Sequence, residues 1–225
     1  MNTWLSFIEN SAQVITLKVP DDMNAYVMFE TLNDRGLRVS QSDLVKNYLF
    51  SEAAGRITEA QDRWSSMNGA LEVLDDSGAT IDFLRYHLIS TYGPLRERDV
   101  LERIRSNVRG RAAAVGFLDA LSSAATDYVA IQTPNNAKWS GASITMGRHV
   151  ADLMLLRVSP LRPLMLSVLR SFGPKDTEIA FRRFVSWSVR WLVAGGARSG
   201  SVEVAIGSAA RDVTSGEIRT VDAFD

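Results

Sequence analysis

The segment FETLNDRGLRVSQSDLVKNYLF, residues 29–50, predicts the end of one helix, a tight turn and the start of another helix. Upstream, residues 21–32 have apolar side chains at helical spacing and begin with aspartates, where the positive end of a helix dipole favours carboxylates. Gly36 can adopt the positive φ of a helix C-terminal cap. Ser40 is expected to cap the next helix, with Asp43 three residues later in an acidic variant of the capping box. The segment therefore predicts two helices joined by a short turn.

Beyond residue 40, apolar residues recur at helical spacing almost throughout. Glycine, proline and acidic turn residues interrupt this pattern at 55, 75–78, 93–94 and 110. The predicted helices cover residues 41–54, 58–74, 80–92, 97–107, 111–131, 143–157, 161–172, 177–193 and 202–214. We therefore expect a mainly α fold, a bundle of roughly nine helices.

One short strand is predicted near the N-terminus, VITLKV at residues 14–19, because it is rich in β-branched residues and precedes a proline. The sequence predicts no second strand to pair with it, so its edge is expected to permit homo-oligomerisation.

The segment QTPNNAKWSG, residues 132–141, combines proline, asparagine and glycine and is the best candidate for a loop or linker. It would divide a helical lobe at 56–131 from a C-terminal helical lobe at 142–225.

The composition is that of a folded protein. The chain has 225 residues, of which 46% are hydrophobic and 23% charged, enough for a substantial core. The absence of cysteine excludes disulfides and agrees with a cytoplasmic location. The start of the chain has no signal-peptide pattern, and arginines and prolines interrupt its most apolar region, 154–169, so no membrane partner is expected. A net charge of −1 argues against indiscriminate attraction to nucleic acid.

The string MFETLNDRGLRVSQSDLVKNYLF resembles the signature of the GmrSD-type restriction proteins. The likeness continues less specifically in FLRYHLISTYGPLRERDVLERI at 83–104 and FVSWSVRWLVAGG at 184–196. The resemblance implies a nucleotide-hydrolysing domain with a DGQQR motif, then a helical region, then an HNH nuclease. Residues 1–55 would be the C-terminal remnant of the DGQQR domain: strand, helix, Asn-Gly turn and helix. The rest would link an upstream nucleotide-hydrolysing domain to a downstream nuclease domain or subunit in a phage-defence protein that contacts modified DNA.

Both catalytic motifs of that family are missing from this sequence. It contains no DGQQR, and its two histidines, His87 and His149, lie in unrelated contexts, whereas an HNH site needs a histidine base and further metal ligands. We expect His87 to be a hydrogen-bonded helix residue. No catalytic residue, metal ligand or cofactor is therefore expected in this chain, and the chain alone is expected to be inactive. Nucleotide and divalent metal are expected only in the full-length family protein, a nucleotide-dependent DNA endonuclease. The alternative is a stand-alone helical protein-interaction module without catalytic activity.

The signature turn and the helix after it contain the first candidate site residues. Phe29, Asn33, Arg35 and Gly36 belong to the signature, and the resemblance implies that Asn33 and Arg35 approach the nucleotide. A junction fixed by a glycine cap is the structural alternative.

In the following helix, Asp43, Lys46 and Asn47 occupy adjacent positions, with Asp43 and Asn47 on one face. They form either a polar site or a cap and a solvated face, and the second interpretation is the commoner one.

A basic segment and an aromatic segment contain the remaining candidates. Arg98, Arg105 and Arg109 fall near one side of a predicted helix and can follow a DNA phosphate backbone. The interleaved acids favour a solvated helix instead, with ion pairs between Asp99 and Arg103 and between Glu102 and Arg105.

An aromatic series at helical spacing can stack on bases but is more typical of a buried face: Phe181, Phe184, Trp187 and Trp191.

Overall fold

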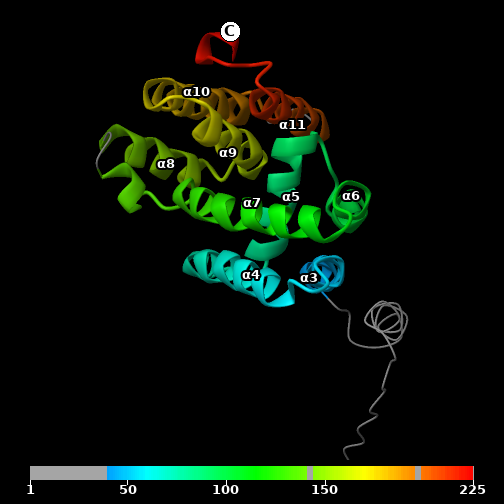
Figure 1. Ribbon diagram of the computed structural model, residues 1–225. Coiled ribbons are helices and arrows are strands. Elements are labelled where there is room, and N and C mark those ends of the chain that lie inside the picture. Colours follow the sequence, from blue (N-terminus) through cyan, green and yellow to red (C-terminus); the bar gives the residue numbers. More distant parts are fainter. Residues whose placement is uncertain (1–39, 141–143, 196–198, 225) are drawn as a thin grey trace, which may run out of the picture. The chain divides into compact units, whose positions relative to one another are not determined.

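The computed structural model describes residues 40–140, 144–195 and 199–224, and these ranges contain nine α-helices and no strand (Figure 1). The helices are α3 (Gln41–Glu52), α4 (Ile57–Leu71), α5 (Ala79–Tyr92), α6 (Val100–Asn107), α7 (Arg111–Ala130), α8 (Ile144–Leu156), α9 (Arg162–Ser171), α10 (Pro174–Val193) and α11 (Ser199–Ser215). The predicted mainly α class is confirmed for this part of the chain. The strand predicted at 14–19, the helix at 21–32 and the signature turn lie outside the described residues.

Short 3₁₀ helices adjoin or connect several of the α-helices: η1 (Glu72–Leu74), η2 (Glu97–Asp99), η3 (Ala137–Trp139), η4 (Ser159–Leu161) and η5 (Val221–Phe224). Two predicted helices were therefore too long as α-helices, since 58–74 ends as η1 and 97–107 begins as η2. The tighter 3₁₀ turn satisfies backbone groups that a helix end leaves unpaired. Asp75 follows η1 in the left-handed conformation, with φ 47°, and stops that helix.

Local capping explains several helix boundaries. Ser40 caps α3 as predicted: its Oγ accepts a hydrogen bond from the Asp43 backbone N–H at 3.2 Å and donates one to Asp43 Oδ2 at 2.7 Å. At the end of α5, Gly93 has a φ of 90°, and Pro94 follows it. α10 begins three residues earlier than predicted because Pro174 occupies its first turn, where a missing N–H costs nothing.

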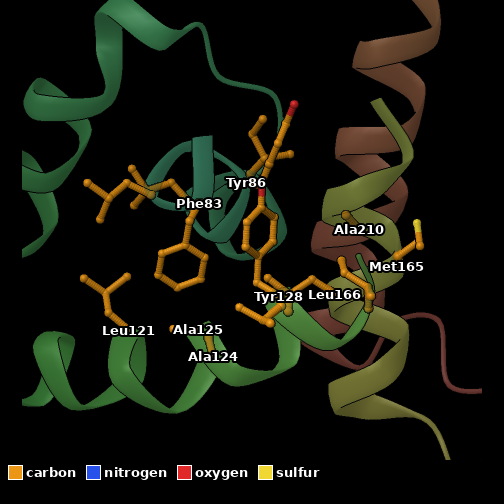
Figure 2. Close-up of a cluster of buried hydrophobic side chains, with 14 of the residues drawn as sticks. Phe83, Tyr86, Leu121, Ala124, Ala125, Tyr128, Met165, Leu166 and Ala210 are labelled. Atoms are coloured by element: carbon orange, nitrogen blue, oxygen red, sulfur yellow. The ribbon is translucent and has the colours of Figure 1, made fainter. Parts of the chain in front are cut away.

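The core lies around α5, which contacts α7, α9 and α11 (Figures 1 and 2). Phe83 of α5 and Tyr128 of α7 are fully or almost fully buried, with ring centroids 5.3 Å apart. Leu166 of α9 is also fully buried. Burial of a phenylalanine or leucine side chain stabilises the fold by about 1.5–3 kcal/mol. Helices on both sides of the 132–141 segment thus share one hydrophobic core, and the division into two lobes stays a prediction.

The segment predicted to be a loop is packed against its neighbours. The Trp139 indole Nε1 donates hydrogen bonds to the carbonyl oxygens of Ala130 and Thr133, each at 3.1 Å. Gly147 of α8 lies so close that an added Cβ would be 2.6 Å from the Pro134 carbonyl oxygen. The loop is therefore held against both α7 and α8.

No helix in the described ranges combines the length and the hydropathy that crossing a membrane requires.

A candidate binding cleft and a buried ionic centre

An open cleft of about 670 Å³ is bordered by α5, α6, η4 and the first turns of α11. This volume falls within the range of small-molecule sites, roughly 300–1,000 Å³. Side chains of α6 and the preceding η2 form one wall, at positions i, i+3, i+4 and i+7 on a single helix face: Asp99, Glu102, Arg103 and Ser106. The opposite face of α6 packs into the core through Val100 and Ile104, both fully buried. The amphipathic α6 therefore turns its polar face to the cleft.

Gly200, Glu203 and Val204 of α11 form the facing wall. One turn further along, Gly207 allows α11 to approach α5 closely. A Cβ at Gly207 would lie 3.1 Å from Ile89 Cγ2 and 3.2 Å from Pro94 Cγ. The small residue thus lets α11 pack closely against Ile89 and Pro94, two residues that line the cleft.

Arg85 of α5 connects the floor of the cleft to its α11 wall. Its Nε donates a hydrogen bond to the Leu95 carbonyl oxygen at 3.1 Å, and its Nη2 lies 3.5 Å from Glu203 Oε2. The neighbouring Tyr86 is 6% exposed, and burial raises the pKa of its phenol. A phenol with a raised pKa stays protonated near neutral pH, so Tyr86 can donate a hydrogen bond but does not serve as a base.

Two other arginines of the cleft, Arg96 and Arg103, have no acidic partner among the described residues. Arg103 is half-buried, and its guanidinium carbon lies 6.0 Å from the centroid of the Tyr92 ring. The predicted Asp99–Arg103 ion pair is absent here, and Asp99 Oδ1 lies 3.6 Å from Arg98 Nε instead. The Arg103 guanidinium lies over the aromatic ring of Tyr92, and this contact takes the place of the ion pair with Asp99.

The second predicted ion pair, Glu102 with Arg105, is also absent within residues 40–140. Arg105 points instead to α3, where its guanidinium carbon lies 5.7 Å from the centroid of the Tyr48 ring. Arg109 Nε donates a hydrogen bond to the Arg105 carbonyl oxygen at 3.2 Å, so these two candidates for DNA contact lie close together. Arg98 contacts Asp99, and none of the three predicted DNA-contact arginines lines the cleft. Their contact with DNA stays a prediction.

The polar candidates on α3 take part in local capping. Asp43 Oδ1 accepts a hydrogen bond from Lys46 Nζ at 2.8 Å, and the hydrogen bonds from Lys46 and then Ser40 lower the pKa of the Asp43 carboxyl. No hydrogen bond of the Asn47 side chain occurs in the part of the chain that the structure describes. These contacts agree with the structural interpretation of Asp43 and Lys46. Phe29, Asn33, Arg35 and Gly36 lie outside the described residues.

The aromatic series on α10 belongs mainly to the core. Phe181 and Phe184 are fully buried, and the Trp187 ring lies 5.4 Å from Phe184 and 5.9 Å from Phe224, between centroids. The buried-face interpretation is confirmed for Phe181 and Phe184, which have no exposed ring face for stacking on a base.

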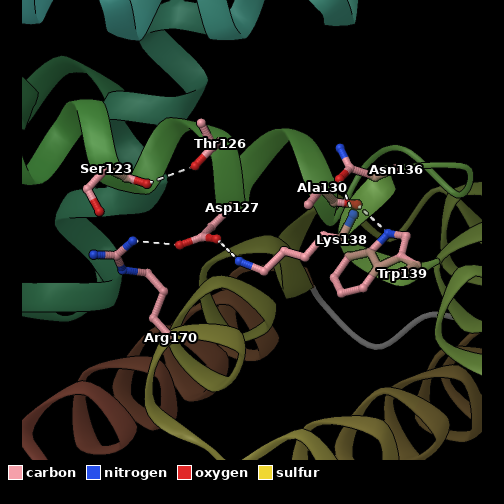
Figure 3. Close-up of polar contacts among 8 residues, drawn as sticks. All are labelled: Ser123, Thr126, Asp127, Ala130, Asn136, Lys138, Trp139 and Arg170. Carbon is pink, nitrogen blue, oxygen red and sulfur yellow. Dashed lines mark hydrogen bonds and ion pairs between the residues drawn. The ribbon is translucent and has the colours of Figure 1, made fainter. Parts of the chain in front are cut away.

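A buried ionic centre joins α7, η3 and α9 (Figure 3). Asp127 of α7 is 8% exposed, and its Oδ2 lies 2.6 Å from Arg170 Nη1, while its Oδ1 contacts Lys138 Nζ. Both carboxylate oxygens thus accept hydrogen bonds from cations, one 11 positions and the other 43 positions further along the chain. The only local signal was a lone aspartate in the apolar run AATDYVAI, which indicates a buried partner without identifying it.

His87 of α5 lies near this centre, between the rings of Phe83 and Phe117. Its Nδ1 is buried and has no hydrogen-bond partner among the described residues. His87 thus lies in a helix as expected, but the expected side-chain hydrogen bond is not found in the described part of the chain. Burial, and to a lesser extent the charge of Arg170, lower the pKa of His87 to about 4. His87 is therefore neutral at physiological pH.

Within the described ranges, no three side chains of the types that bind metals cluster as a metal site would require. The comparisons with known proteins match no family model, no curated protein and no solved structure.

Proposed function

We propose that this chain is the helical part of a GmrSD-like restriction or phage-defence protein, in which it joins a nucleotide-hydrolysing domain to a DNA nuclease domain or subunit. The observation that carries the proposal is the string MFETLNDRGLRVSQSDLVKNYLF at residues 28–50. In this proposal the nucleotide and the divalent metal bind to the other domains, and this chain contributes no catalytic residue. The protein acts in the cytoplasm.

The position of α3 supports a linking role. This helix directly follows the signature turn in sequence, and its Val45 and Leu49 are fully buried in the helical core. Tyr48 donates a hydrogen bond from its hydroxyl group to the Val108 carbonyl oxygen at 2.7 Å, and the Glu52 carboxylate accepts one from the Gly110 N–H. A displacement of α3 is therefore transmitted to the junction of α6 and α7, because packed helices move as rigid elements.

A DNA-binding titration over a series of salt concentrations tests the DNA contact in this proposal, with the same duplex in unmodified and methylated form. Each phosphate contact contributes about −0.9 to the slope of log affinity against log salt. The triple variant Arg98→Gln, Arg105→Gln, Arg109→Gln should flatten the slope by about 2–3. The triple variant Arg63→Gln, Arg148→Gln, Arg182→Gln removes the same charge elsewhere and should bind like the parent. Absence of binding to both duplexes contradicts a direct DNA contact.

The alternative, a stand-alone helical interaction module, has one specific observation in its favour. Leu155 of α8 is 82% exposed and Val193 of α10 is 83% exposed. Exposed aliphatic residues of this kind are frequent at protein–protein contacts when they belong to one continuous patch. A gene in which a DGQQR-encoding segment precedes this sequence in the same reading frame supports the restriction-protein proposal, and its absence supports the alternative.

A further inference from the structure

We propose that the cleft between α6 and the start of α11 binds a small anionic ligand with an apolar part, whose phosphate or carboxylate group is contacted by Arg96 and Arg103. This inference is independent of the proposed DNA contact, which involves a different set of arginines.

The arginines of the cleft differ in whether they have an acidic partner. Arg85 is occupied by the Leu95 carbonyl oxygen and by Glu203, whereas neither Arg96 nor Arg103 has an acidic partner in the described part of the chain. The chain does not lack acids, since it has 26 acidic against 25 basic residues. Asp99 is within helical reach of both arginines but contacts Arg98. Two guanidinium groups therefore remain available at one cleft, and guanidinium matches the geometry of phosphate and carboxylate.

An apolar surface lies between the charged walls of the cleft. It consists of aliphatic and proline side chains: Ile89, Pro94, Leu95, Pro160, Pro163 and Val204. Prolines have a fixed φ, and Ile89 is 6% exposed within the packed α5, so this surface is largely preformed. A preformed apolar surface with a few polar groups is typical of sites for small molecules, because little conformational entropy is lost on binding.

The acidic residues of the cleft restrict the class of ligand. Two of the three acids that line the cleft have a cationic partner: Asp99 Oδ1 lies 3.6 Å from Arg98 Nε, and Glu203 Oε2 lies 3.5 Å from Arg85 Nη2. The third acid, Glu102, has no cationic partner among the described residues. A nucleic acid backbone that followed the cleft would pass the Glu102 carboxylate and be repelled by it. A compact ligand can contact Arg96 and Arg103 through one anionic group while its apolar part covers Ile89 and Val204.

An NMR titration of the ¹⁵N-labelled protein tests the proposal with three probes that share a benzene ring. These are phenyl phosphate, 3-phenylpropionate and uncharged benzyl alcohol. We expect at least one of the two anions to give saturable shifts of backbone amides in residues 95–106 and 200–207, and the anion that binds more tightly identifies the anionic group. Benzyl alcohol should bind about tenfold more weakly or not at all.

Two double variants distinguish the contribution of Arg96 and Arg103 to binding from the effect of removing two positive charges elsewhere on the protein. Arg96→Gln with Arg103→Gln should weaken binding about tenfold or more. The matched pair Arg148→Gln with Arg182→Gln removes the same charge from exposed positions of α8 and α10 and should leave binding unchanged. A dispersed amide spectrum for each variant establishes that it is folded.

Three results would overturn the proposal. The first is no saturable shift with either anion up to about 10 mM, far above the concentration at which a weak site saturates. The second is an equal loss of binding in both double variants. The third is tighter binding of a single-stranded oligonucleotide than of phenyl phosphate at the same amides, which assigns the cleft to nucleic acid.

Discussion

Arg170 and Lys138 both contact the buried carboxylate of Asp127, whereas Arg96 and Arg103 line an open cleft without an acidic partner in the described residues. Both regions lie where several helical elements meet. Around Asp127 the elements are joined through a buried carboxylate whose two cationic partners remain partly exposed. At the cleft, water reaches the arginines and the helix walls remain apart.

The difference shows that burial decides whether a charged side chain must have a partner of opposite charge. A buried charge without a partner costs several kcal/mol, so the pairing at Asp127 follows from its burial. A solvated arginine has no such requirement, and its pairing contributes roughly 0–1 kcal/mol. Charges at the buried centre are therefore expected to affect stability, and charges at the cleft are expected to affect binding.

Asp127→Ala should have the largest effect, because it leaves two cations at the α7–α9 contact without their acceptor. We expect the free energy of unfolding to fall by about 2–4 kcal/mol, since Arg170 and Lys138 are partly exposed and regain some hydration. Urea denaturation measures the change. The matched control is Asp119→Ala on the same helix, where Asp119 lies 3.1 Å from Arg63 at the surface and should contribute less than about 1 kcal/mol. Equal effects of the two variants would contradict the distinction.

Acidification should lower the free energy of unfolding, because the buried His87 side chain is neutral in the folded protein. The pKa of His87 is about 4 in the folded protein and 6.5 in an unfolded chain, so the unfolded state binds more protons between these values. Stability is therefore lost as the pH falls through this window, by about 2 kcal/mol between pH 7 and pH 5. Urea denaturation of the parent and of His87→Leu at both pH values isolates this contribution. Parallel pH dependence in the two proteins would exclude His87 as the source.

Gly147→Ala should destabilise the loop contact beside the buried centre. The new Cβ would lie 2.6 Å from a backbone oxygen of Pro134, and backbone must shift to accept it. We expect a net loss of about 1–2 kcal/mol after the better helix propensity of alanine is included. Gly116→Ala on α7 meets no atom within 4 Å and should instead stabilise by about 0.5–1 kcal/mol. Thermal denaturation of both variants measures the two changes in stability. The prediction fails if Gly147→Ala changes stability in the same direction and by the same amount as Gly116→Ala.

Arg96→Gln with Arg103→Gln should have the smallest effect on stability. Neither side chain has an acidic partner in the described chain, and substitutions at such surface positions usually change stability by less than about 0.5 kcal/mol. The same urea experiment measures this. A loss comparable with that of Asp127→Ala would make the cleft arginines structural and remove the contrast between the two regions.

Local sequence patterns predicted much of the described fold. Ser40 identified the start of α3, and Gly93 with Pro94 identified the end of α5, because caps and helix breakers act through adjacent backbone. The same local rules gave the wrong partners for Arg103 and Arg105. Helical spacing predicted acidic partners, but Tyr92 and Tyr48 come from other helices and stack on these guanidinium groups.

The two regions compared above depend on contacts between distant segments. Asp127 meets Arg170, which is 43 positions away, and no sequence period links them. The cleft is lined by residues of α5, α6 and α11, and α11 packs against Ile89 and Pro94 at Gly207, a contact that no local sequence pattern predicts. Helical spacing therefore favoured Arg98, Arg105 and Arg109 on one helix face, whereas the fold places Arg85, Arg96 and Arg103 at the cleft.

The indole of Trp139 has a consequence for proteolysis. Its N–H lies between the carbonyl oxygens of Ala130 and Thr133 and holds in place a polar connection that contains two asparagines, and exposed polar loops are preferred sites of proteolysis. A protease must extend its substrate, and this segment reaches an extended form only after the indole leaves its two acceptors. Limited digestion is therefore expected to spare residues 131–140 as long as the molecule is folded.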